Sequence, residues 1–402
     1  MDADEILQHT ANAGDRAVID RLEGMHAPQA KGMTLRQRWR RTMFFQHVDV
    51  LPNMEFGYWE ETLTGWHRQG LPPEVTDEAS AYAYFGIENW ETCWGIDVMG
   101  LRPGFTYEVL SEDADYRTYR ADDGSVQRIN RHGHKSIPQH LSFPISDRSS
   151  WESFRERLRP GPERLTATWP TLAAAYQDRT YPLAIWFGSL IGLPRNWIGF
   201  ENIAIMVKEE PELLEEIVET LCQLICDSLG RVLPDVEFDF GVGWEDICFN
   251  GGPIVGPRFM QDVVRPRYQR ITRLLARHGC HLAWTDCDGN ILPILDSFAG
   301  GGINICFPVE VHGGSDPFAI RRRHPDQRLQ GGFDKMKLRA GRAAIRAEVD
   351  RLTPLVRAGG FVPGVDHRVQ ADVSFDDYRY YLRLKLEVWG CGGIPHYDER
   401  LV

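Results

Sequence analysis

The second half of the chain alternates short apolar runs with amphipathic segments. From residue 180 onward we predict six buried strands, at 181–187, 238–244, 281–285, 303–307, 328–331 and 360–363. Helical periodicity separates them, most clearly over 211–230 and also over about 258–278, 339–358 and 375–389. Strands and helices that alternate at this spacing predict βαβ units around a parallel sheet.

The number of strands favours a closed barrel. Two further strands, at 50–54 and near 95–97, bring the total to eight, the number found in a (β/α)₈ TIM barrel. A doubly wound sheet is the alternative, but no Gly-x-Gly-x-x-Gly motif follows any predicted strand. We therefore predict an α/β protein in which residues 34–402 form a single (β/α)₈ barrel.

Two parts of the chain depart from this repeat. Residues 1–33 are polar with weak helical periodicity, so we expect an N-terminal helical arm before the capping box at 34–37. Residues 105–145 alternate polar and apolar positions, and Asp123-Gly124 is a hairpin-turn signal. This second pattern predicts an antiparallel β insertion that covers part of the barrel mouth.

Composition limits the class of protein. The 402 residues carry 45 Lys and Arg against 57 Asp and Glu, a formal net charge of −12. We expect no nucleic-acid partner, because phosphate recognition needs a basic surface. We also expect no membrane partner, since no apolar run reaches the roughly 18 residues of a span. The acidic start lacks a signal-peptide pattern, and eight scattered cysteines favour free thiols in the cytoplasm.

Ionisable residues gather where the predicted strands end, which is where a barrel carries its catalytic groups. The acid–base candidates are Glu245, Glu310, Asp334 and His367. Repeated carboxylates at strand ends predict a convergent polar pocket. The structural alternative is that these acids cap the helices that follow them.

One subset has the donor types of a metal site. Asp286 and Asp288 follow one strand, and His367 follows the last. Carboxylate oxygens and an imidazole nitrogen suit a divalent ion such as zinc or manganese, and zinc is the ion we expect. The alternative is a carboxylate pair that binds only backbone amides and Arg side chains.

Aromatic residues near the same loops predict an apolar part of the pocket, although core packing explains most of the 12 tryptophans. The expected substrate-binding residues are Glu55, Tyr58, Trp59, Trp186, Trp244 and Asn290. Cys287 lies between two acids, which make a thiol a poor nucleophile.

The order of several segments resembles that of uroporphyrinogen decarboxylase-like proteins. These segments are 33–59, 186–190, 286–290, 331–334 and 363–367. The resemblance spans about residues 34–395 and implies a (β/α)₈ barrel. True uroporphyrinogen decarboxylases carry an arginine-rich segment after the first strand, where this chain has Glu55 and aromatic residues. We do not expect that reaction, because Arg is the residue suited to carboxylate recognition.

The chain looks closer to the family's corrinoid-dependent methyltransferases, which are zinc enzymes with a His-x-Cys pair and a late Cys. These positions fall on Asp286, Asp288 and His367, all of which can bind a metal. The resemblance therefore implies a harder site that suits Lewis-acid activation of an oxygen-bearing substrate.

Three functions follow from these patterns. The first is metal-assisted methyl transfer or O-demethylation, in which a small substrate passes its methyl group to a corrinoid carried by a separate partner protein. The second is a cofactor-free decarboxylase or lyase for a small carboxylic acid, with Arg195 or Arg258 as anion clamp. The third is a binding protein without turnover, which the self-repelling carboxylates disfavour. A homodimer is the assembly we consider.

Overall fold

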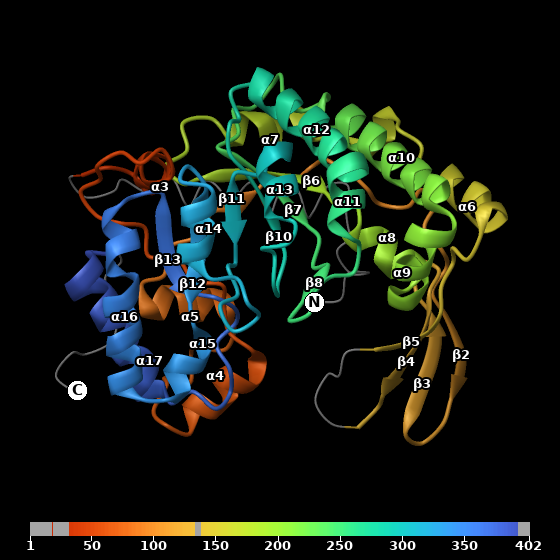
Figure 1. The fold of residues 1–402 in the computed structure, drawn as a ribbon. Coiled ribbons are helices and arrows are strands. Elements are labelled where there is room, and N and C mark those ends of the chain that lie inside the picture. Colours follow the sequence, from red (N-terminus) through yellow and green to blue (C-terminus); the bar gives the residue numbers. More distant parts are fainter. Residues whose placement is uncertain (1–17, 19–31, 133–137, 393–402) are drawn as a thin grey trace.

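The computed structural model describes residue 18, residues 32–132 and residues 138–392, so most of the predicted arm at 1–33 lies outside the described residues. A seven-stranded parallel sheet curls through the centre of the protein (Figure 1). In spatial order its strands are β1 (Glu91–Thr92), β6 (Leu183–Gly188), β7 (Phe240–Trp244), β10 (Ala283–Asp286), β11 (Ile305–Phe307), β12 (Arg328–Phe333) and β13 (Phe361–Val365). All six strands predicted after residue 180 are present, with ends shifted by at most two residues.

Helices connect the strands, as the predicted repeat requires. Before β6 come α3 (Leu35–Met43), α4 (Glu60–His67), α5 (Glu78–Phe85), α6 (Arg148–Arg155) and α7 (Trp169–Ala175). Between β6 and β10 come α8 (Gly192–Ile198), α9 (Phe200–Glu209), α10 (Pro211–Leu229), α11 (Pro257–Phe259) and α12 (Arg265–Arg277). The rest are α13 (Leu295–Gly301), α14 (Pro317–Arg323), α15 (Lys335–Arg339), α16 (Arg342–Arg357) and α17 (Phe375–Leu384). A π-helical turn, η3 (Met260–Val264), interrupts the helix predicted at 258–278, because Pro266 has no amide hydrogen to donate.

The closed eight-stranded barrel is not confirmed. The predicted first strand, 50–54, forms one isolated parallel bridge, between Leu51 and Cys391. Pro52 cannot donate to a ladder. The amide of Val365 at the free edge of β13 donates instead to the side chain of Glu55, at 2.8 Å. The strand predicted near 95–97 lies earlier, at Glu91–Thr92.

Two apolar cores lie on the two faces of the sheet. The larger one packs the outer face of the sheet against the helices. The smaller one fills the inside of the curl and includes Trp39 and Met43 of α3, together with Phe240, Trp284 and Val362. The rings of Trp39 and Phe240 are 4.5 Å apart, at the start of β7. Helix α3 therefore plugs the amino end of the sheet and leaves the carboxyl end for a site.

The predicted β insertion is present as a four-stranded antiparallel sheet. Its strands are β2 (Glu108–Glu112), β3 (Tyr116–Arg120), β4 (Val126–Asn130) and β5 (Gln139–Ser142). The Asp123-Gly124 turn joins β3 to β4, with Gly124 at a φ of 86°. The insertion lies on the side toward which the parallel strands run (Figure 1). It therefore stands beside the carboxyl end of the large sheet. Among the described residues, no helix is long and apolar enough to cross a bilayer.

A buried ion pair anchors the segment that precedes α4. The Nζ atom of Lys385 lies 2.5 Å from Oε1 of Glu55, and both side chains are fully buried. The hydroxyl of Tyr381 donates to the same carboxylate at 3.0 Å. Removing one partner of such a pair leaves an uncompensated buried charge, which is costly.

We predict that Lys385→Met lowers the free energy of unfolding by about 3–5 kcal/mol, measured by urea denaturation. The matched control is Arg383→Met, whose side chain is 38% exposed and lies 3.9 Å from Glu387; the loss there should stay below about 1 kcal/mol. Adding Glu55→Gln to Lys385→Met should recover much of the stability. Equal losses in the two single variants would contradict the buried-pair interpretation.

Candidate active site

Four ionisable side chains from three strand ends meet at the carboxyl end of the sheet. Asp246 follows β7, Asp286 ends β10 and Asp288 comes two residues later. His367 follows β13, and its Nε2 atom lies 3.3 Å from Oδ2 of Asp288. The charges of Asp246 and Asp288 both act on Asp286. The structure thus gathers the three predicted metal donors and adds Asp246; we call these four residues the acid cluster.

Burial raises the pKa of two carboxyl groups in the acid cluster. Loss of water raises the pKa of Asp286 well above its usual range, and the charges of Asp288 and Asp246 raise it further. Burial also raises the pKa of Asp246, while Arg195 lowers it and Asp288 raises it. A carboxyl group with a raised pKa keeps its proton closer to neutral pH, so Asp286 can serve as a proton donor.

One oxygen of the acid cluster is left without a partner. Oδ1 of Asp288 is buried and accepts no hydrogen bond, whereas Oδ2 faces His367. An unsatisfied buried polar atom costs about 1–3 kcal/mol, so native proteins contain few of them. The atom is therefore available to a substrate or a cation.

A cavity of about 520 Å³ adjoins the acid cluster, and Asp286 is part of its wall. The other lining residues are Glu55, Phe56, Glu78, Tyr82, Asn89, Trp90, Glu91, Thr92, Trp94, Phe307 and Arg368. The guanidinium of Arg368 in this wall is already paired with Glu78 at 2.6 Å, so it is not free to clamp an anion, and the cavity favours neutral molecules over anions.

Aromatic rings form the apolar wall beside the acid cluster. The ring of Phe56 stacks 4.9 Å from His367 on one side and 5.2 Å from Phe307 on the other. Trp59 lies 5.9 Å from His367 and is 44% exposed. The stack fixes the plane of the imidazole, and Trp59 shields it from solvent.

Arg368 is a site residue that the sequence reasoning missed. Its guanidinium is 2.6 Å from Glu78 and donates to the carbonyl of Tyr58 at 2.8 Å. The same charge acts on Asp286 and lowers its pKa, against the larger effect of burial. The sequence feature that could have identified Arg368 is its position directly after His367, at the end of a predicted strand.

Several predicted site residues carry structural hydrogen bonds instead. Glu245 is fully buried, and its oxygens accept the amides of Leu190, Ile191 and Gly192 at 2.6–2.8 Å. The hydroxyl of Tyr268 also donates to Glu245. This saturated carboxylate holds the loop after β6 on the outer side of the sheet.

Two other predicted acids fix neighbouring loops. Glu310 pairs with Lys335 at 2.5 Å and accepts the amide of Gly289 at 2.7 Å. Burial opposes ionisation, but these partners together hold the pKa of Glu310 below its usual range. Asp334 caps α15 by accepting the amide of Met336 at 2.9 Å.

The remaining predicted substrate contacts are scattered. Tyr58 is buried, and its hydroxyl bonds that of Tyr378 at 2.8 Å. Trp244 lies under the guanidinium of Arg195, 5.1 Å from the ring centre. Asn290 accepts the amide of Leu292 at 3.1 Å. Of the predicted contacts, Glu55 lines the cavity beside the acid cluster, and Trp186 lines a separate cavity.

The side chains of the acid cluster are of the types that bind metal ions, but their positions do not form a three-ligand site. Asp288 and His367 are in contact, and the unpartnered Oδ1 of Asp288 could face a cation. Within the part of the chain that the structure describes, no three His, Cys, Asp or Glu side chains surround a common point. Catalytic zinc uses three protein ligands, and of the three predicted donors Asp288 and His367 are the pair in contact.

We predict that Asp286→Asn weakens the pH dependence of stability. A folded-state pKa above the unfolded value means that stability is greatest below the unfolded pKa and falls as pH rises through the window above it. The wild-type melting temperature should therefore drop more than that of Asp286→Asn between pH 4.5 and pH 8, as measured by calorimetry. The exposed carboxylate control Asp262→Asn should follow wild type. Parallel curves for wild type and Asp286→Asn would contradict the raised pKa.

The fold is similar to that of a solved methyltransferase from Methanosarcina mazei. The two chains share 13% sequence identity at a TM-score of 0.55, over 88% of this chain and 99% of the other. No protein-family model matches this sequence, and no curated protein matches it. At this identity the likeness establishes the fold alone, and membership of the uroporphyrinogen decarboxylase-like family is not confirmed.

Proposed function

We propose that this protein is an enzyme that transfers a methyl group from a small methoxy or related substrate to an acceptor. The observation that carries the proposal is the position of Asp286 in the wall of an aromatic cavity, where burial raises its pKa well above the usual range. The likeness in fold to a methyltransferase supports the same reaction class. The proposed acceptor is a corrinoid held by a separate protein, as the resemblance in sequence implies.

The charges in the cavity favour this reaction over decarboxylation of a small acid. A carboxylate substrate needs a free cationic clamp. Arg195 is engaged by Asp246, at 3.3 Å, and Arg258 is 96% exposed beside Asp262. The guanidinium of Arg368 in the wall is engaged by Glu78 at 2.6 Å, so a methyl ether enters the cavity more readily than an anion.

The residues of the chain supply binding and proton transfer. Phe56 and Trp59 hold the apolar part of the substrate beside His367. As the carbon–oxygen bond breaks, the methyl group goes to the nucleophilic acceptor, and the electron pair stays on the oxygen. Asp286 gives its proton to that oxygen, so an alcohol leaves. His367 is one-fifth exposed and paired with Asp288, which suits it to restoring protons from solvent.

A divalent metal, zinc first, is the second part of the proposal. Asp286, Asp288 and His367 would hold it, with Asp286 ionised, and Lewis-acid polarisation of the substrate oxygen would then take the place of proton donation by Asp286. We also place the protein in the cytoplasm, since all eight of its cysteines are free thiols.

The test follows methyl transfer to free cob(I)alamin from a panel of methoxylated aromatic compounds and methylated amines, monitored by the visible spectrum of the corrinoid. We predict transfer by wild type and a loss of about 10²-fold or more in His367→Gln and Asp286→Asn. Metal content, measured on protein purified without chelator, should fall in Asp288→Asn if the metal part is right.

The matched control is His324→Gln, because His324 forms a surface pair with Asp296 at 2.8 Å. It should leave the rate unchanged. Carbon dioxide release from a panel of small acids, without methyl transfer, would favour the decarboxylase instead. Binding of panel compounds without either reaction would favour the non-catalytic alternative.

A further inference from the structure

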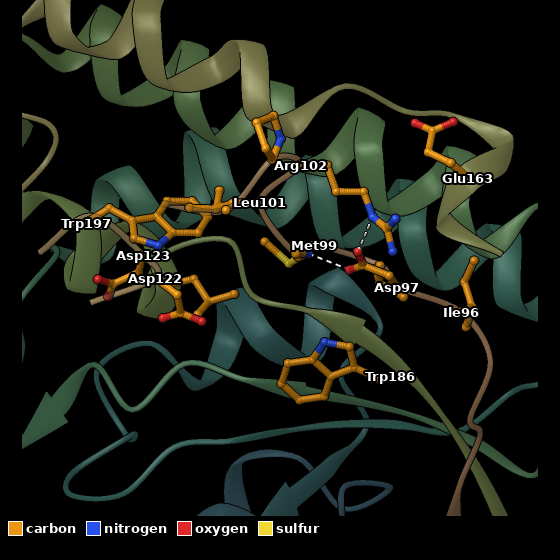
Figure 2. A pocket seen from close by; sticks show the side chains of 15 residues that line it. Ile96, Asp97, Met99, Leu101, Arg102, Asp122, Asp123, Glu163, Trp186 and Trp197 are labelled. Carbon is orange, nitrogen blue, oxygen red and sulfur yellow. Dashed lines mark hydrogen bonds and ion pairs between the residues drawn. The ribbon is translucent and has the colours of Figure 1, made fainter. Parts of the chain in front are cut away.

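A second cavity, of about 820 Å³, opens between β6 and the loop formed by residues 96–104 (Figure 2). Its lining consists of loop 96–104, Asp122, Asp123, Glu163, Trp186, Leu193 and Trp197. Within the described chain it shares no lining residue with the cavity beside the acid cluster. We call it the Trp186 cavity, and the proposed methyl transfer does not account for it.

The loop that forms one wall is held in place without a ligand. The amide of Ser189 donates to the sulfur of Met99 at 3.1 Å, which ties the loop to the end of β6. Asp97 accepts the amide of Gly100 and Nε of Arg102, each at 2.6 Å. Because these contacts already satisfy the loop, the cavity exists before a ligand arrives, and binding costs little ordering.

The turn between β3 and β4 of the insertion is also held in one conformation by contacts within the protein. Gly124 has a left-handed φ of 86°, and a Cβ there would lie 2.7 Å from the ring of Phe105. Oδ1 of Asp123 accepts both the amide and the hydroxyl of Ser125, at 2.8 and 2.6 Å. The turn therefore presents Asp122 and Asp123 to the cavity from a constant position.

The charge of the Trp186 cavity selects the ligand. Four carboxylates line it, and the guanidinium of Arg102 is bonded to one of them, Asp97. The wall is therefore net negative and unsuited to anions. The apolar side comes from tryptophan and leucine, and Figure 2 shows Asp122, Asp123, Trp186 and Trp197 around one space.

We propose that the Trp186 cavity binds an organic ammonium ion. The face of Trp186 attracts the alkyl groups that carry the positive charge, as aromatic rings do for quaternary ammonium ligands. Asp122, Asp123 and Glu163 compensate the charge at longer range. The volume accommodates a body larger than the ammonium group itself, so the ligand is an amine with an apolar or polar extension.

The experiment measures binding of choline and of its neutral isostere, 3,3-dimethylbutan-1-ol, to the full chain by isothermal titration calorimetry. Phenyltrimethylammonium serves as a larger cation. The cations should bind at least tenfold more tightly than the isostere. Trp186→Leu should weaken cation binding by roughly 3- to 30-fold. The double variant Asp122→Asn, Glu163→Gln should weaken it several-fold and reduce its salt dependence.

The matched control is Phe200→Leu, also an aromatic-to-leucine change, because Phe200 is 46% exposed and lines neither cavity. It should leave cation binding unchanged, and melting temperatures should show that each variant folds. The proposal is overturned if neither cation binds at millimolar concentration, if the isostere binds equally well, or if Phe200→Leu has the larger effect. The readout is binding alone, so failure of methyl transfer does not affect it.

Discussion

The buried carboxylate of Glu55 holds the free edge of the curled sheet. It accepts the amide of Val365 at the end of β13, and it pairs with Lys385 just after α17. The last strand and the last helix are thereby tied to the segment that stands where the eighth strand was expected. His367 follows Val365 by two residues, and its distance from Asp286 therefore depends on the bond that holds Val365 to Glu55. The position of His367 therefore rests on a fully buried ion pair, whose loss would leave an uncompensated buried charge.

Hydrogen bonding separates the carboxylates that build this fold from those available for chemistry. Glu245 is saturated by backbone amides and hydroxyls. Asp366 accepts the amides of Val311 and Lys335 and so joins the loops after three strands, although burial raises its pKa to about 7. Asp288 instead keeps an unpartnered buried oxygen. That oxygen can accept a bond from a ligand, whereas the oxygens of Glu245 are already occupied.

The parallel sheet and the insertion could be predicted because their signals are local, in the alternation of apolar runs and in one Asp-Gly turn. The sequence also distinguishes the neighbouring acids Glu245 and Asp246, of which one faces the site. The inner face of β7 carries alternate residues, Phe240, Val242 and Trp244, and this alternation continues to Asp246 rather than to Glu245. That choice was readable in the sequence. The sequence could not show that the segment 50–54 fails to form the eighth strand. Its Leu51 forms backbone hydrogen bonds with Gly390 and Gly392, which are distant in sequence. The Trp186 cavity also arises from contacts between segments distant in sequence.

Helix α3 has a kinetic consequence for any reaction at the acid cluster. Its Trp39 is fully buried inside the curl, so within the described residues the amino end is filled and molecules reach the cluster from the carboxyl side. The acceptor protein proposed above would have to dock on that same side. Once docked, it would cover the route that a small substrate uses. In the proposed methyl transfer the substrate would therefore have to enter first and its demethylated product leave last, which would impose a compulsory order on the two partners.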